Sequence, residues 1–200
     1  MSSIRSWKSA YQKHSRACLT SLFIIAASVI ILSALAVKNR FENYELDFML
    51  SFVPDALNVH SVVYAKEESW GFGPGGNEAG VRVYPLAEVD ARLVREGGAD
   101  YLANLPPNQS QDGRRWRGIY SEWQETPIKP SRKWLPDRKI ELFRVYDYLC
   151  GYGFCLKVEK SVIDEITSIV NSPGSYYAYG RIGLIIVSPN QKKVIYLYNG

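Results

Sequence analysis

Histidine and cysteine are scarce in this chain of 200 residues, which contains two His and three Cys. So few imidazoles and thiols exclude a His-rich metal centre and a scaffold held together mainly by disulfides. Common catalytic motifs are missing too, since there is no Gly-x-Ser-x-Gly elbow, no His-Glu-x-x-His and no Cys-x-x-Cys. We therefore predict no catalytic residue, no metal and no cofactor, and we favour a binding protein over an enzyme.

Acidic residues are absent before Glu42, although six cations lie in the same stretch. The remaining residues, 41–200, carry 18 basic and 20 acidic side chains, so the net charge of +4 belongs to the N-terminus. A pI of 8.9 that arises in this way does not indicate a basic surface for nucleic acid, and we predict no nucleic-acid partner.

Charge is also absent from residues 17–37, where only Thr20, Ser21, Ser28 and Ser33 are polar. A helix of this length crosses a hydrocarbon core of about 30 Å. Four cations precede the segment and two follow it, and the positive-inside rule then places the N-terminus in the cytoplasm. The predicted organisation is a cytoplasmic N-terminus (1–16), a transmembrane signal anchor (17–37), a membrane-proximal connector (38–56) and a periplasmic domain (57–200) at a bacterial inner membrane.

The same segment has two other interpretations. Ala34-Leu35-Ala36 fits the small-x-small pattern of a signal-peptide cleavage site after Ala36, although the apolar run is longer than usual for a signal peptide. A buried helix of a soluble domain would normally show a polar stripe, which is missing here. Whether the anchor is cleaved stays open at this point, and both leading interpretations export the domain.

Export of the domain to an oxidising compartment bears on Cys150 and Cys155, because disulfides form there. Four residues separate them, unlike the two of a redox or zinc motif, and two of those four are glycines. A short loop of this kind can fold back in an oxidising compartment, and we predict a disulfide between the two cysteines. The alternative is a pair of reduced, buried cysteines beside a helix end.

The distribution of apolar residues predicts an α+β fold, a small antiparallel sheet with two or three helices packed on one face. Strands are expected from about Val59 toward Glu68 and at 81–84, and a hairpin at 176–187 and 194–198. Helical spacing starts at Leu86 and stops at Gly97-Gly98. The expected later helices lie near 140–149, an ambiguous stretch, and from Ser161, where Ser161 and Asp164 resemble a capping box.

The glycine-rich segment 71–77 is the first candidate site. Consecutive backbone N–H groups of such a loop can hold an anion, but neither a Walker lysine nor a following helix is present. A structural turn is the simpler interpretation. In a binding loop, a ligand would meet the following side chains: Trp70, Phe72, Asn77 and Glu78.

The second candidate is the basic stretch 112–139, which carries a net charge of +4, whereas residues 41–111 carry −7. Arginine and tryptophan are typical interface anchors. The predicted partner-binding residues of this stretch are Arg114, Arg115, Trp116, Arg117 and Trp123. Alternatively, the tryptophans pin an irregular loop to the core while the charges face water.

These observations predict a membrane-anchored module of the cell envelope that binds a protein, with an immunity-type factor as one form. Its oligomeric state is left open. One alternative is an envelope enzyme acting on glycan or peptide, for which Glu78 and His60 are the candidate groups. Another is a structural subunit of a membrane complex.

Overall fold

The computed structural model describes the chain except for residues 1, 71–76, 109–116, 130–141, 152–154 and 200. The side chains of residues 2–25, Trp70 and Asn77 also lie outside the description. The chain divides into two compact units, residues 1–45 and 46–200.

The described part of the first unit is helical, because α1 runs from Ser2 to Leu50 and ends within the second unit. Large apolar side chains of this unit are exposed. The exposed fraction lies between 52% and 68% for Val29, Ile30, Ile31, Leu32, Leu35 and Val37. Over the described side chains, no helix has an apolar stretch long enough to cross a membrane. The predicted anchor begins at Ala17, so its first part, 17–25, falls outside the described side chains.

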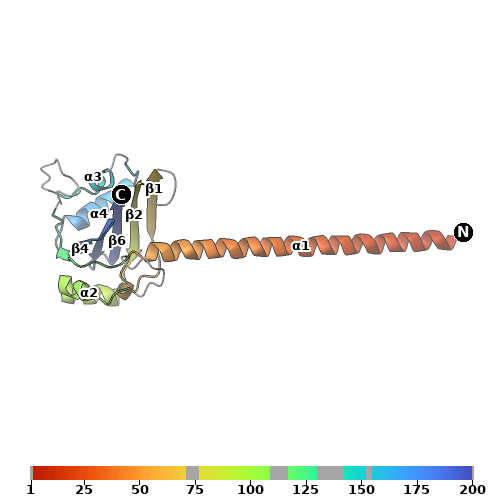
Figure 1. The fold of residues 1–200 in the computed structure, drawn as a ribbon, viewed down its shortest axis with the longest axis horizontal. Helices are drawn as coiled ribbons and strands as arrows, with labels where there is room; N and C mark the ends of the chain where they lie inside the picture. Colours follow the sequence, from red (N-terminus) through yellow and green to blue (C-terminus); the bar gives the residue numbers. More distant parts are fainter. Residues whose placement is uncertain (1, 71–76, 109–116, 130–141, 152–154, 200) are drawn as a thin grey trace. The chain divides into compact units, whose positions relative to one another are not determined.

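The second unit contains one six-stranded antiparallel sheet in the order β1-β2-β6-β5-β4-β3 (Figure 1). The strands are β1 (Tyr64–Trp70), β2 (Asn77–Pro85), β3 (Gln124–Glu125), β4 (Tyr176–Tyr179), β5 (Gly183–Ser188) and β6 (Lys193–Asn199). The predicted α+β class with an antiparallel sheet is therefore confirmed, together with the C-terminal hairpin, which is β5–β6.

Two strand predictions were wrong in detail. The run 176–187 is two strands rather than one, because the chain reverses after Tyr179, where the Gly180 N–H donates to the Gly183 carbonyl at 2.7 Å. The strand expected from Val59 begins only at Tyr64, after the short 3₁₀ helix η1 (Asp55–Leu57) and an irregular segment.

The helices of the second unit, besides the end of α1, are α2 (Glu88–Ala103), α3 (Val145–Leu149) and α4 (Lys160–Val170). The predicted stop at Gly97-Gly98 is a break instead, because Gly98 has a φ of 59° and the helix resumes after it. The predicted capping box at Ser161 was wrong, since Glu159 is the N-cap residue and makes no capping hydrogen bond through its side chain.

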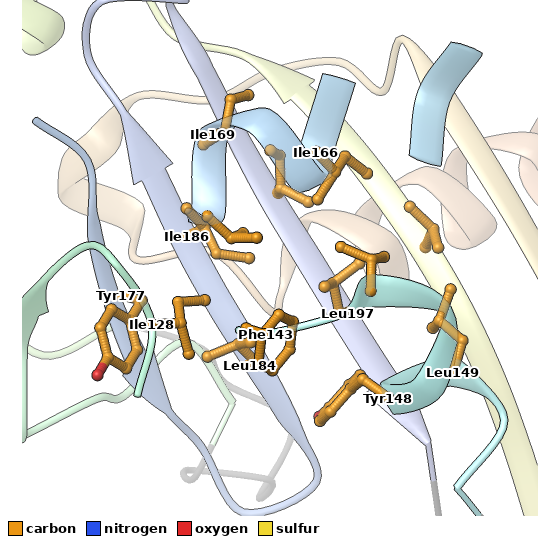
Figure 2. Packing of buried hydrophobic residues seen from close by; sticks show 14 of the residues in the cluster. Ile128, Phe143, Tyr148, Leu149, Ile166, Ile169, Tyr177, Leu184, Ile186 and Leu197 are labelled. Atoms are coloured by element: carbon orange, nitrogen blue, oxygen red, sulfur yellow. The ribbon is translucent and has the colours of Figure 1, made fainter. Parts of the chain in front are cut away.

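Helices cover both faces of the sheet, so the prediction that they pack on one face was wrong (Figure 1). The α4-side core joins α3 and α4 to strand residues that include Leu184, Ile186 and Leu197, as Figure 2 shows. The α2-side core joins α2 to the alternate strand residues, among them Ile185, Val187, Val194 and Tyr196. Every residue of β5 is buried, and apolar residues lie on both faces of this strand. Both faces of the sheet must therefore be covered by other elements.

The segment 46–56, part of the predicted connector, belongs to the second unit. Phe52, Val53 and Leu57 are buried in the α2-side core. Hydrogen bonds hold the segment as well, since the Tyr84 hydroxyl donates to the Met49 carbonyl at 2.8 Å and the Tyr120 hydroxyl to the Phe52 carbonyl at 2.7 Å. The compact unit that contains the sheet therefore starts at Leu46.

Candidate functional site

A buried arginine, Arg82, joins charged and polar side chains on the α2-side face of the sheet. Arg82 lies on β2 and is only 3% exposed. Its Nη2 donates to Glu67 Oε2 at 2.7 Å and to the Tyr198 hydroxyl at 3.0 Å, and that hydroxyl donates to the same Glu67 oxygen. A buried guanidinium requires such pairing, because removing an isolated charge from water is costly. We call Glu67, Glu78, Arg82 and Tyr198 the Arg82 cluster.

The strand register brings this cluster together around a glycine. Gly80 on β2 lies opposite Glu67 on β1 and opposite Tyr198 on β6. A Cβ at Gly80 would lie 2.1 Å from Cζ of the Tyr198 ring. The missing side chain therefore leaves the space through which Tyr198 crosses β2 and reaches Glu67.

Two phenylalanines lie against the guanidinium of Arg82. Its Cζ is 5.3 Å from the ring centre of Phe48 and 5.0 Å from that of Phe52. Arg117 packs on the same two rings, at 4.5 Å and 4.9 Å. These distances lie within the range of cation–π attraction, which partly offsets the loss of hydration of both cations.

Two predicted partner-binding residues are therefore core residues. Arg117 is 5% exposed and its Nη1 lies 3.5 Å from Ser51 Oγ. Trp123 is 8% exposed and packs edge-to-face with Tyr120, the ring centres 5.7 Å apart. For these two residues the structure supports the alternative in which this segment is pinned to the core. Arg114, Arg115 and Trp116 lie outside the described residues.

Among the glycine-loop candidates, Glu78 belongs to the Arg82 cluster. It is half-buried, and the pKa of its carboxyl is raised, first by burial and then by the charge of Glu67, with Arg82 acting in the opposite direction. Phe72 and the side chains of Trp70 and Asn77 lie outside the description. His60, the other group proposed for an enzyme, is exposed.

Replacing Glu78 with Gln tests the cost of its charge. The pKa of Glu78 is higher in the folded state than its ordinary value of 4.5. Protonation of Glu78 therefore stabilises the fold below pH 4.5, and this stabilisation is lost as the pH rises through the folded-state pKa. We expect Glu78→Gln to raise the urea midpoint modestly at pH 7 and to match the unaltered protein below pH 4.5. The control is Glu122→Gln, which removes an exposed carboxylate. An equal change at both pH values would contradict the assignment.

Cys150 and Cys155 are joined by a disulfide, with their Cα atoms 4.3 Å apart. The bond closes the segment directly after α3. Among the residues that the structure describes, no three His, Cys, Asp or Glu side chains gather closely enough to hold a metal ion.

Sequence reasoning missed Arg82, Glu67 and Tyr198. The alternation of Arg82 with Val81 and Val83 predicted a strand but gave no partner for the arginine, which is buried because both faces of the sheet are covered. The available signal was Gly80, because a glycine inside a strand often marks the close approach of another group.

No protein-family model, no curated protein and no solved structure matches the chain.

Proposed function

We propose that the chain is a single-pass protein of the bacterial inner membrane whose domain lies in the periplasm and binds a protein partner. Residues 17–37 form the anchor in this proposal. The charge pattern supports it, with cations on both sides of the segment and no acidic residue before Glu42. The exposure of Val29, Ile31 and Leu35 on α1 supports it too, because such side chains favour hydrocarbon over water.

The disulfide between Cys150 and Cys155 is the observation that carries the location. Disulfides persist in the periplasm and outside the cell, whereas the cytosol keeps thiols reduced. The disulfide therefore supports the same side of the membrane as the charge pattern does.

The binding role rests on the basic, tryptophan-rich stretch. Because Arg117 and Trp123 are buried, the proposed contact residues narrow to Arg114, Arg115 and Trp116. Arginine and tryptophan contribute most to protein interfaces when they are desolvated. An immunity-type factor, which neutralises a toxin by binding it, is one form that such a module takes.

A topology experiment tests the location. Alkaline phosphatase fused after Gly200 should be active, a cytoplasm-specific fluorescent fusion should be dark, and Cys150 and Cys155 should resist alkylation until a reductant is added. The matched control fuses both reporters after Arg16, where the signals should be reversed. Fluorescence from the C-terminal fusion would refute the proposed orientation.

The contact surface is tested separately by crosslinking in intact cells. A triple Ala variant of Arg114, Arg115 and Trp116 should lose the crosslinked partner, while Arg92→Ala, an exposed arginine on α2, should keep it. Equal recovery with both variants would exclude this surface.

An envelope enzyme remains the second candidate because of Glu78. Its carboxyl has a raised pKa, caused first by burial, and it is close enough to Glu67 to feel that charge. Two carboxylates in different environments are a recurring arrangement in acid–base catalysis. Hydrolysis of a peptidoglycan fragment that disappears in Glu78→Gln would favour this candidate over the binding module.

A further inference from the structure

The outer edge of the sheet at β1 is a long, charged strand. β1 pairs with β2 along all seven of its residues, and no other strand in the described part of the chain pairs with it. An edge strand exposes backbone N–H and C=O groups on its open side, and these can pair with another strand. Its side chains at Ala65, Glu67 and Glu68 are exposed.

The side chains of β1 divide between the two faces of the sheet. Lys66 lies opposite Val81 and Glu68 opposite Ala79, and both partners belong to the α4-side core. Lys66 and Glu68 are therefore on the α4 side, whereas Glu67 is on the α2 side with Arg82. The α4-side face of the edge thus carries one cation and one anion, two residues apart.

We propose that two copies of this chain pair through β1 and form one continuous antiparallel sheet. The inference stands on β1 alone and does not depend on the proposed function. The occupant of the edge is identified by charge complementarity between β1 and a second, antiparallel β1.

Symmetry limits how two β1 strands can pair. Neighbouring antiparallel strands are related by a twofold axis perpendicular to the sheet, which keeps each face of one copy continuous with the same face of the other. Such an axis must pass between two copies of the same residue. Centred on Lys66 it places lysine opposite lysine, and centred on Glu68 it places glutamate opposite glutamate. Only the axis at Glu67 places Lys66 opposite Glu68 of the second copy, and it does so twice.

The axis at Glu67 also pairs the whole strand, from Tyr64 to Trp70. Opposite charges directly across an antiparallel pair are stabilising, whereas like charges are destabilising. Glu67 faces itself at the axis, but its carboxylate is already bonded to Arg82 and Tyr198. Its charge is therefore compensated within each copy before the two copies meet.

Charge reversal tests this pairing on the full chain in detergent, with the protein mass obtained by light scattering. The unaltered chain should have twice the mass of one chain, which is 22.7 kDa. Lys66→Glu and Glu68→Lys should each halve the mass, because each sets like charges opposite one another at two places. The double variant Lys66→Glu/Glu68→Lys should restore the dimer, since it exchanges the charges and keeps the pairs.

The control is Arg92→Glu, which reverses an exposed cation on α2 and should leave the mass unchanged. A monomeric unaltered chain would overturn the proposal. Single reversals that stay dimeric, as expected for association through another surface, would overturn it too, and so would a double variant that stays monomeric while its circular dichroism matches the unaltered chain.

Discussion

Replacing Arg82 with alanine is expected to lower the free energy of unfolding of the domain by about 3 kcal/mol, the lower end of the range for breaking a buried ion pair. The lower end applies because Glu67, whose side chain is 42% exposed, can recover hydration when its partner is lost. The variant also removes the guanidinium from the rings of Phe48, Phe52 and Tyr198. A cavity then remains among side chains that cannot fully collapse.

Two further variants separate charge from packing. Arg82→Met retains an apolar chain of similar reach against the rings, so we expect it to lose less stability than Arg82→Ala. Lys160→Ala breaks the ion pair with Asp164 at the surface, and we expect no measurable loss. Urea unfolding followed by tryptophan fluorescence measures all three. A loss below about 1 kcal/mol for Arg82→Ala, the range of surface pairs, would mean that the cluster does not stabilise the fold.

Replacing Gly183 with alanine is the second large effect that we expect. Gly183 is the first residue of β5 and lies opposite Tyr198 on β6. A Cβ there would lie 2.6 Å from the carbonyl oxygen of Leu197 and 2.6 Å from Cζ of Tyr196. Because one of these atoms is backbone within the sheet, relief requires that the two strands move apart. Overpacking of this kind costs about 1–3 kcal/mol, and we expect the upper part of the range.

The matched control for this variant is Gly151→Ala. The nearest atom to a Cβ at Gly151 is the Tyr148 carbonyl oxygen at 3.4 Å, an ordinary contact. The urea midpoint should therefore fall clearly for Gly183→Ala and little for Gly151→Ala. Equal midpoints for the two variants would show that β5 and β6 can adjust without loss.

The C-terminal hairpin was predictable because its pattern is local. Val194, Ile195 and Tyr196 favour an extended chain, and the preceding Pro189 and Asn190 favour a turn. Residues Val162, Ile166 and Ile169 likewise give α4 its apolar face, although the start of that helix was misplaced. A pattern confined to a few residues predicts the local structure correctly when no contact with a distant residue opposes it.

The Arg82 cluster was not predictable in the same way. Glu67 and Tyr198 are 131 residues apart, and only the antiparallel register of β1, β2 and β6 brings them to the same face of the sheet, one on each side of Gly80. The prediction of Arg117 as a partner-binding residue was wrong for a related reason. A basic stretch suggests a solvated surface, and only the fold shows that Phe48 and Phe52 cover the guanidinium of Arg117.

The sequence by itself determined the α+β class, the hairpin and the separation of a basic N-terminus from a mildly acidic remainder, since these follow from composition and short-range periodicity. Only the tertiary structure decided that both faces of the sheet are covered, that Arg82 and Arg117 are buried on shared aromatic rings, and that β1 is one of the two edge strands. The physical reason is that alternation along a strand separates its two faces, whereas the order of the strands and the partners of each face depend on contacts between residues far apart in the chain.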